Sequence, residues 1–482
     1  MFDMRPVGYV IGLLVTVLGA TMLLPMVVDL AEGRGHWPVF AESAIITVVC
    51  GLTLSLSCSN SISGGLSLQQ TFLLTTGVWA ALPFFGAIPF ALGATEADFV
   101  DAYFEAMSGL TTTGATVFTG LDDLPKGLLL WRGILQWLGG IGIIVVAMVF
   151  LPELRVGGMQ IFRSEGFDTF GKILPRATEI SARISTIYLT LTLACALAYL
   201  ASGMTAFDAT VHAMTTLSTG GFGNSDKSFG AFPGAVEYVA VFFMLASALP
   251  YVRFVQITAG SARPLFEDRQ VQVFLALVAG ITLLASFGYA MRFDTFSAEV
   301  FREALFNVTS IITGTGYSST DYQLWGPFMI ALIFFTGLIG GCAGSTSCSV
   351  KVFRYQLLFA SIRAQVRRIL APHGVFTPKY NGRPVDEDVL NSVMAFFVLY
   401  FVTLGVISVA LGMTGQDIVT SVSGAAAALS NIGPGLGDQI GPAGNFGMLG
   451  DTEKVILTIA MLIGRLELMA VFVLFTIRFW RA

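Results

Sequence analysis

Four segments decide the fold of this chain, because each ends in a run of Gly, Thr and Ser with one glycine at the same register. They read VDAYFEAMSGLTTTGAT (100–116), FDATVHAMTTLSTGGFG (207–223), REALFNVTSIITGTGYS (302–318) and the looser SVSGAAAALSNIGPG (421–435). The shared glycines are Gly114, Gly221, Gly316 and Gly433. Self-similarity at such long intervals indicates internal duplication.

The regions around these segments are apolar enough to cross a membrane. The chain has 482 residues, of which 55% are hydrophobic and 12% charged, against roughly 25% charged residues in an ordinary soluble domain. A spanning helix needs roughly 20 apolar residues. Ten spans are therefore expected, at about 7–30, 39–57, 68–94, 128–151, 184–203, 235–258, 271–291, 327–350, 389–412 and 455–477. This composition leaves no stretch long enough for a soluble catalytic domain.

Each of the four segments lies between two spans and is too short to cross a bilayer of about 30 Å. Two spans per unit place all four loops on the same side of the membrane. We therefore predict an all-α polytopic membrane protein with four tandem repeats of span, half-helix, loop and span around a pseudo-fourfold pore, preceded by two extra spans. The expected divisions are 1–67 for the N-terminal pair, 68–151 for repeat 1, 152–260 for a cytoplasmic connection and repeat 2, 261–350 for repeat 3, and 351–482 for a basic cytoplasmic connection and repeat 4.

Charge assigns the loops to a side of the membrane. Six Lys and Arg residues lie on the loop-bearing side and seventeen on the opposite side, so by the positive-inside rule the half-helices enter from outside and both termini are cytoplasmic. Eighteen acidic residues, Glu105, Asp122, Asp123 and Glu237 among them, are expected outside. An acidic mouth raises the local concentration of cations and repels anions; the alternative is that these loops are merely solvated.

Four Gly-centred loops can supply rings of backbone carbonyls, which replace the hydration shell of a cation in a pore. Glycine permits positive φ, and the half-helices aim their partially negative C-terminal ends at the same point. Thr and Ser hydroxyls, at Thr112, Thr113, Ser218, Thr219, Thr313 and Thr315, add further oxygens. A single such patch is typical of helix packing, but four at one register indicate a selectivity filter. The expected filter residues are Thr112, Thr113, Gly114, Thr219, Gly220, Gly221, Gly314, Thr315, Gly316, Asn431, Ile432 and Gly433.

The phrases LTTTGAT, STGGFGN, TGTGY and SNIGPG, each between two spans, resemble the pore loops of the Trk/Ktr/HKT superfamily of potassium transport proteins. The two extra N-terminal spans resemble those of the TrkH-type subunit. The resemblance covers nearly the whole chain. Segment 313–317 approaches a potassium-channel signature, whereas segment 431–434 departs most from the family pattern, so selectivity is expected to be looser than in a true potassium channel.

The resemblance implies a K⁺ permeation subunit of a bacterial cytoplasmic (inner) membrane, which would pass K⁺ and, with looser selectivity, Rb⁺ and Na⁺. It also implies a homodimer gated by a cytosolic TrkA-type nucleotide-binding ring. Nucleotide is expected only on that partner, no covalently bound cofactor is expected, and the only metal expected is K⁺ in the filter. The protein is expected to lie in the lipid bilayer and to bind no nucleic acid. The basic stretches 152–183 and 351–388 are long enough to dock a partner, although topology alone also explains their charge.

Two spans carry interruptions. The sequence FFTGLIGGCAGSTSCSVKVF (334–353) is rich in residues that weaken a helix, and backbone that breaks inside a membrane must line a cavity or be covered by protein. The resemblance implies a loop here that obstructs the pore below the filter; the alternative is a small-residue packing face. The expected gate residues are Gly340, Gly341, Cys342, Ala343, Gly344, Ser345, Thr346, Ser347 and Arg465.

Arg465 is the second interruption, because it lies inside the apolar run 455–475. Glu467 is two residues away, and residues two apart on a helix point to different faces. We expect Arg465 to project into the pore below the filter, with a structural ion pair as the alternative, since charges inside a membrane are by default functional.

Other chemistry finds little support in the sequence. The five cysteines (Cys50, Cys58, Cys195, Cys342 and Cys348) form no disulfide or zinc pattern. The three histidines are too scattered for a metal site, and no catalytic constellation is present, so the chain is not expected to be an enzyme. A secondary cation symporter, coupled to H⁺ or Na⁺, is the alternative function, but it needs ionisable relay residues within the spans.

Overall fold

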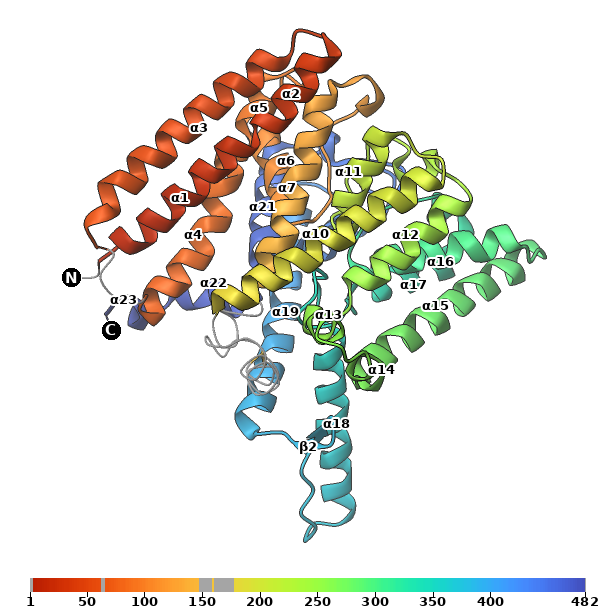
Figure 1. Ribbon diagram of the computed structural model, residues 1–482. Coiled ribbons are helices and arrows are strands. Elements are labelled where there is room, and N and C mark those ends of the chain that lie inside the picture. The colour runs from red at the N-terminus through yellow and green to blue at the C-terminus, as the bar shows by residue number, and fades with distance from the viewer. Residues whose placement is uncertain (1–2, 62–65, 147–157, 160–176, 482) are drawn as a thin grey trace.

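The protein is almost entirely helical, as the sequence predicts (Figure 1). The computed structural model describes residues 3–61, 66–146, 158–159 and 177–481. Within these ranges the β-structure is one small antiparallel pair, β1 (Lys379–Tyr380) and β2 (Arg383–Pro384). The predicted class of multi-span helical membrane protein is confirmed. The basic residues Arg155, Arg163, Lys172 and Arg176 of the first expected cytoplasmic connection lie outside the described residues.

Each repeat begins with a long span and continues into a half-helix. The opening spans are α4 (Leu68–Gly86) with α5 (Ile88–Leu92), α10 (Ala177–Ala201), α15 (Arg269–Phe293) and α19 (Glu387–Met413). The four pore helices, as we name the half-helices, are α6 (Phe99–Leu110), α11 (Ala206–Leu217), α16 (Ala298–Thr313) and α20 (Ile418–Ser430). The closing spans begin with α7 (Lys126–Val145), α12 (Ala235–Ser247), α17 (Pro327–Gly337) and α21 (Asp451–Arg465). This order is compatible with four repeats, and the exact divisions stay predictions.

Three closing spans are not continuous, whereas the sequence predicts interruptions in two of the ten expected spans. Seven helices among the described residues are long and apolar enough to cross a membrane. The expected span 235–258 is α12 followed by α13 (Tyr251–Thr258) at 91°, and 455–477 is α21 followed at 105° by the segment from α22 (Met469–Phe472) to Phe475. The expected span 327–350 ends as a helix at Gly337. The sequence indicates the interruptions in repeats 3 and 4, but it does not indicate the break after Ser247.

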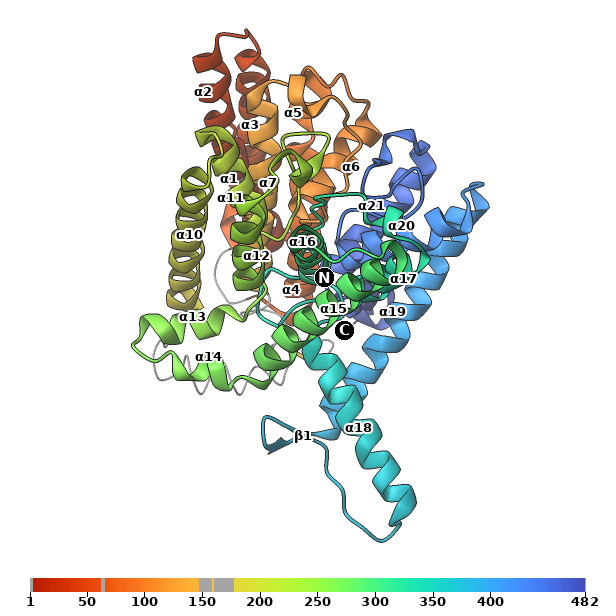
Figure 2. The ribbon, with the colours of Figure 1, turned by 90° about the vertical axis from the view of Figure 1, so that its right-hand side faces the viewer.

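The repeats close into a ring by packing each closing span against the pore helix of the next repeat. Helix α7 packs against α11, α12 against α16, α17 against α20, and α21 against α6 (Figure 2). Each pore helix is thus held between its own two spans and one span of the preceding repeat. The last of these contacts joins repeat 4 to repeat 1, so the chain returns to its starting repeat and encloses one axis.

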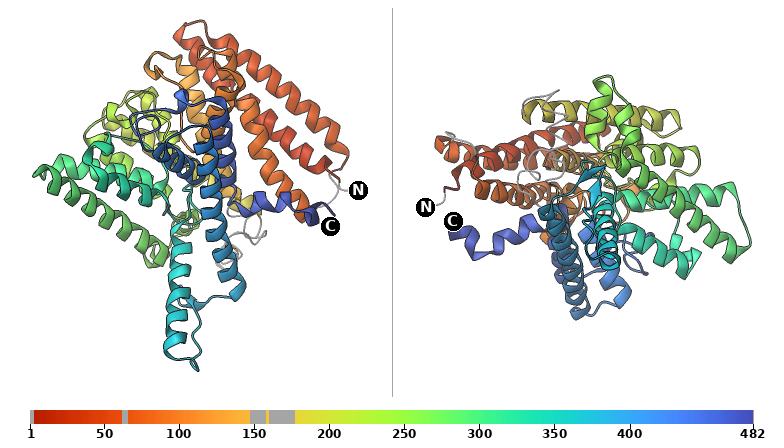
Figure 3. Two further views of the ribbon diagram at one scale, coloured as in Figure 1. Left: turned by 180° about the vertical axis from the view of Figure 1, so that it is seen from behind. Right: turned by 90° about the horizontal axis from the view of Figure 1, so that it is seen from below.

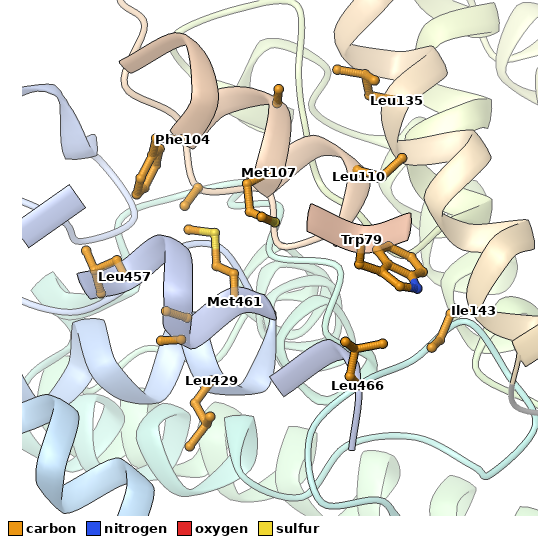
Figure 4. Close-up of a cluster of buried hydrophobic side chains, with 14 of the residues drawn as sticks. Trp79, Phe104, Met107, Leu110, Leu135, Ile143, Leu429, Leu457, Met461 and Leu466 are labelled. Atoms are coloured by element: carbon orange, nitrogen blue, oxygen red, sulfur yellow. The ribbon is translucent and has the colours of Figure 1, made fainter. Parts of the chain in front are cut away.

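The contact that closes the ring is a buried apolar cluster (Figure 4). Met107 and Leu110 of α6 lie among side chains of α7, α20 and α21, together with Trp79 of α4. Met461 of α21 has no exposed surface and Met107 is 1% exposed. Burying such side chains supplies about 25 cal/mol per Å² of apolar surface, so this cluster stabilises the junction between the first and last repeats.

The N-terminal spans pack on the outside of repeat 1. They consist of α1 (Arg5–Thr21), α2 (Leu23–Glu32) and α3 (Trp37–Cys58), which contact one another and then α4 and α7. The buried carboxylate of Asp29 on α2 accepts a hydrogen bond from the backbone N–H of Gly127, at 2.6 Å. This bond fixes the N-terminal spans to the start of α7, the first closing span.

Helix α18 (Val352–Leu370) and the two short strands form an arm that projects from the helical body (Figures 1 and 2). The arm carries Arg363, Arg367, Arg368, Lys379 and Arg383. The two ends of the described chain lie close together, where α23 (Ile477–Arg481) approaches the start of α1 (Figure 3). The remaining short helix is α14 (Arg263–Glu267), which connects α13 to α15.

A glycine on α7 tests whether close packing against the pore helix stabilises the ring. A Cβ at Gly139 would lie 1.8 Å from the carbonyl oxygen of Leu110, whereas a Cβ at Gly280 on α15 would meet no atom within 4 Å. We expect Gly139→Ala to lower the thermal unfolding temperature of the detergent-solubilised protein. Gly280→Ala should raise it slightly, because alanine gains about 1 kcal/mol over glycine in a helix. Equal shifts in the two variants would contradict this packing.

Candidate functional site

The four pore helices each begin with an N-cap, a residue whose side chain accepts a hydrogen bond from a backbone N–H of the first turn. Asp98 accepts from Asp101 N at 2.8 Å, Thr205 from Asp208 N at 3.1 Å, Ser297 from Val300 N at 3.2 Å and Asp417 from Val419 N at 3.0 Å. Such caps satisfy backbone donors that a helix start leaves unpaired. Each helix then ends directly before its Gly-containing loop, which places its partially negative end at the ring.

The four loops share one backbone conformation. In each, two alternate residues have positive φ, namely Thr112 and Gly114, Thr219 and Gly221, Gly314 and Gly316, and Asn431 and Gly433. The residue between them donates to the carbonyl five residues earlier, from Thr113 N, Gly220 N, Thr315 N and Ile432 N at 2.8, 2.8, 2.8 and 3.0 Å. The fourth loop therefore has the same fold as the others although its side chains differ most.

The register glycines, Gly114, Gly221, Gly316 and Gly433, leave space for the neighbouring loop. A Cβ at Gly114 would lie 2.1 Å from Gly220 O, one at Gly221 1.9 Å from Thr315 O, and one at Gly316 1.8 Å from Ile432 O. A Cβ at Gly433 would lie 2.9 Å from Thr113 O. These contacts run from loop 1 to 2, 2 to 3, 3 to 4 and 4 to 1, so the loops form a closed ring without room for a side chain at this register.

Most backbone carbonyls of the ring accept no hydrogen bond. Among the described residues, eleven of the twelve carbonyls at the expected filter positions have no donor, and Gly220 O alone accepts one, from Gln136 Nε2 at 2.7 Å. Nine of these residues are buried and three, Gly114, Gly221 and Gly316, are half-buried. Most buried carbonyls in native proteins are paired. A ring of unpaired carbonyl oxygens is suited to bind a dehydrated cation.

The side-chain hydroxyls of the loops are mostly engaged with each other, which limits their expected contribution of ligand oxygens. Thr313 and Thr315 share a hydrogen bond of 2.8 Å, and so do Thr111 and Thr113. Asn431 Nδ2 donates to Thr113 Oγ1 at 2.9 Å and so joins loop 4 to loop 1. Ser218 and Thr219 donate to nearby backbone carbonyls, and the buried Thr112 Oγ1 has no partner in the described structure.

A cavity of about 270 Å³ opens on one side of the ring. All four register glycines line it, together with the connections that lead to the closing spans. The exposed Asp226 also lines it, and its carboxylate accepts hydrogen bonds from Gly120 N and Leu121 N at 2.8 and 3.1 Å. The cavity therefore joins the ring to the side on which the pore helices begin.

Two acids that were expected to face the outside are buried in ion pairs instead. Glu105 has no exposed surface and pairs with Arg132 at 2.8 Å, and Glu237 pairs with Arg302 at 2.9 Å. Asp101, on a pore helix, pairs with Lys454 at 2.5 Å. The acidic excess at the mouth is smaller than the residue count indicates, because part of it neutralises bases inside the protein.

The irregular segment 340–349 lies beside the other end of the ring. A Cβ at Gly314 would be 3.8 Å from Cys348 N. The segment bonds to the break in the closing span of repeat 2; the closing spans of repeats 1 to 4 are called spans 1 to 4 from here on. Cys342 N donates to Ala248 O at 3.0 Å, and Tyr251 N donates to Gly344 O at 2.9 Å. Residues 340–348 are all buried. The expected gate residues 340–347 thus form one hydrogen-bonded segment next to the ring of loops.

Arg465 is buried against this segment and has no carboxylate partner in the described structure. Its guanidinium donates to Gly139 O at 3.0 Å, to Thr346 O at 3.5 Å and to Cys348 Sγ, and its Nε has no partner. The structure thus brings Arg465 into contact with segment 340–349. The sequence places these residues in one group of expected gate residues. The alternative of an ion pair for Arg465 is not observed in the described residues.

The structure also contains a cluster of buried charges that the sequence does not indicate. Glu467 accepts from Lys351 Nζ at 2.6 Å and also pairs with Arg354, and all three residues are buried. Lys351 and Arg354 belong to the basic stretch 351–388, which the sequence predicts as a cytoplasmic connection, but both side chains are buried in this cluster. The available signal was the position of Lys351 and Arg354 directly after the broken span, where apolar residues continue on both sides.

The chain is similar to known proteins along its whole length. Residues 36–480 match the TrkH family, described as a cation transport protein. The chain is 41% identical to the Trk system potassium uptake protein TrkI of Halomonas elongata, with 99% of this chain and 97% of that protein covered. It is 35% identical to the Trk system potassium uptake protein TrkH of Escherichia coli, with 99% of each covered. The crystal structure of the potassium transporter TrkH from Vibrio parahaemolyticus superposes with a TM-score of 0.90 at 34% identity, covering 100% of both chains.

The register glycines make a graded prediction about the ring. Alanine at Gly114, Gly221 or Gly316 would meet a backbone carbonyl at about 2 Å, whereas at Gly433 the distance is 2.9 Å. Positive φ adds about 1–2 kcal/mol of strain at all four positions. We expect the first three variants to lose at least about tenfold in cation flux or in discrimination between cations, and Gly433→Ala to lose less. Ion flux into liposomes measures both, and four variants equal to the wild type would contradict the ring.

Proposed function

Because this chain belongs to the TrkH family of cation transport proteins, we propose that it takes up K⁺ across the cytoplasmic membrane of a bacterium through the ring of four loops. The family consists of transporters and not of enzymes. The observation that carries the proposal is the ring of buried and half-buried backbone carbonyls, eleven of which have no hydrogen-bond donor among the described residues. Relatives named as potassium uptake proteins support K⁺ as the cation.

The physical basis of permeation is an exchange of ligands. An ion that enters the ring gives up water oxygens and gains carbonyl oxygens, and it moves on because several similar sites follow one another. The C-terminal ends of four pore helices add partial negative charge at the same place. Loops 1 to 3 carry Thr or Gly at the position where loop 4 has Asn431, whose amide is bonded to Thr113 Oγ1. We infer weaker K⁺ over Na⁺ discrimination than in a channel with four identical loops.

Segment 340–349 and Arg465 together form the gate of this pore. The segment lies next to the filter residue Gly314 and is held by bonds to the break in span 2. Arg465 adds a positive charge at the same level, and a buried positive charge opposes the entry of a cation. For ions to pass, the segment has to leave its position, which requires that its bonds to Ala248, Tyr251 and Arg465 break.

The chain acts in a larger assembly, as a homodimer whose gate responds to a cytosolic TrkA-type nucleotide-binding ring. The projecting basic arm of α18 supports this proposal, since only two residues separate α18 from segment 340–349 and the arm extends away from the helical body. Motion of the arm would thus reach the gate directly. The excess of Lys and Arg on this side supports cytoplasmic termini.

Proton-coupled symport finds less support. A proton-coupled symporter needs carboxylates that take up and release protons within the membrane. The buried carboxylates nearest the ring, Glu105 and Glu467, are each held in ion pairs with bases. A permanently paired acid is a poor proton carrier, because losing its charge would leave a buried base without a partner.

Ion flux in liposomes tests the proposed function. Purified protein should carry ⁸⁶Rb⁺, as a tracer for K⁺, faster than ²²Na⁺, and it should do so without a proton gradient. Empty liposomes and liposomes that contain the Gly316→Ala variant serve as controls. Transport that stops when the proton gradient is removed would replace this proposal with a symporter, and protein that carries neither ion would contradict it.

Arg465 variants test the gate. We expect Arg465→Ala to raise the basal ⁸⁶Rb⁺ flux by about tenfold, because it removes a charge next to the filter and the bond to Thr346 that holds segment 340–349. Arg465→Lys keeps the charge but not the planar fork of donors, so it distinguishes the two causes. Thermal unfolding should be measured in parallel. Flux at or below that of the wild type in a stably folded Arg465→Ala protein would refute the barrier.

A further inference from the structure

The limb that follows each register glycine, residues 115–117, 222–224, 317–319 and 434–436, is held in place in two different ways. In repeats 1, 3 and 4, a pore-helix side chain accepts from the backbone N–H of the third limb residue. Glu105 Oε2 accepts from Val117 N at 2.9 Å, Asn307 Oδ1 from Ser319 N at 3.2 Å, and Ser423 Oγ from Leu436 N at 2.8 Å. In these repeats, the pore helix itself fixes the strand that leaves the filter.

In the described part of repeat 2, no pore-helix side chain accepts from the matching backbone N–H, that of Asn224. His212 stands at the register of Glu105 and Asn307, but its Nδ1 is bonded to Asp208 O at 2.9 Å. Its Nε2 is buried without a partner in the described structure. The side chains of Phe229, Phe232 and Tyr317 lie against the imidazole of His212. The pore helix of repeat 2 contacts its limb through the side chain of Asn224, whose Nδ2 donates to Asp208 Oδ1 at 2.9 Å, and another element holds the limb backbone.

That element is α7, the closing span of repeat 1. Gln136 lies along the second loop, where its Oε1 accepts from Phe222 N at 3.1 Å and its Nε2 donates to Gly220 O at 2.7 Å. Arg132, one turn earlier, donates from Nη1 to Gly223 O at 2.8 Å, and its guanidinium lies 4.1 Å from the centre of the Phe222 ring. Both side chains are buried, with exposures of 0% and 1%.

Arg132 also ties the second loop to the first. Its Nε donates to Glu105 Oε1 at 2.8 Å and its Nη2 to Thr116 Oγ1 at 3.2 Å. Glu105 in turn holds the limb of repeat 1. One buried ion pair thus fixes the limbs of two adjacent loops, whereas loops 3 and 4 depend on neutral side chains of their own pore helices.

We propose that Gln136, supported by Arg132, is a positioning residue that sets the carbonyl of Gly220 and thereby the discrimination between K⁺ and Na⁺. This inference rests on the proposed function and assigns it a specificity-determining contact. Gly220 O is the one carbonyl of the ring that has a donor in the described structure, and it lies against Gly114 of the neighbouring loop. A donor on one carbonyl holds its direction and lowers the negative charge that it offers to an ion, and selectivity depends on the number and field strength of such carbonyls.

The test removes the amide of Gln136 and compares two ions. In Gln136→Leu, we expect the ratio of ⁸⁶Rb⁺ to ²²Na⁺ flux in liposomes to change by about fivefold, the effect of losing the net hydrogen bond to Gly220 O. Thermal unfolding should be measured in parallel, because this variant also leaves Phe222 N without its acceptor. Gln136→Glu keeps an acceptor for Phe222 N and loses the donor to Gly220 O, so it should also change the ratio.

Two arginines provide the matched control. Arg132→Lys cannot keep the bonds to both Glu105 and Gly223 and should change the ratio as well. Arg253→Lys affects an ion pair of similar length, with Asp268 at 2.7 Å, at the break in span 2, and it should leave the ratio unaltered. A folded Gln136→Leu or Gln136→Glu protein with the wild-type ratio overturns this inference alone. A wild-type protein that carries no ⁸⁶Rb⁺ overturns the proposed function instead, so the two failures are distinguishable.

Discussion

A carbonyl oxygen of the next loop lies where each register glycine would carry a side chain, and the rest of the structure depends on this close approach. At Gly114, Gly221 and Gly316 the distance to a built Cβ is about 2 Å. The loops can come this close only because glycine has no Cβ and accepts positive φ. The pore helices, their caps and the spans between them hold four separate pieces of chain at that separation, and the ring of carbonyls follows from it.

The breaks in the closing spans obey a second constraint, which comes from the membrane. Backbone groups released from a helix inside a bilayer need partners in the protein. Spans 2 and 3 break at the same level and satisfy each other, since Ala248 and Ser247 accept from Cys342 and Thr346. Arg465, at the break in span 4, donates to the same segment and to Gly139 of span 1. One hydrogen-bond network thus offsets the cost of the unpaired backbone groups at the breaks, and this network lies beside the ring of loops.

Buried charge differs on the two sides of the ring. On the side of the cavity, Glu105 and Arg132 form a pair without net charge. On the opposite side, Lys351 and Arg354 pair with Glu467, and Arg465 is buried without a carboxylate partner in the described structure, so these four side chains together carry a net positive charge. A cation in the proposed pore would meet this positive charge beside segment 340–349.

The sequence by itself determined the helical class, the repeated loops and the glycine register, because these depend on apolar run length and on a residue type that recurs at fixed positions. It also indicated the interruptions at 340–349 and Arg465, since polar and small residues inside an apolar run are conspicuous. Only the tertiary structure decided the break after Ser247, the pairing of Glu467 with Lys351 and Arg354, and the hydrogen bonds of Gln136 to the second loop. These features join residues from different repeats. No local pattern records which side chains meet when four spans close into a ring, because that depends on packing across the whole chain.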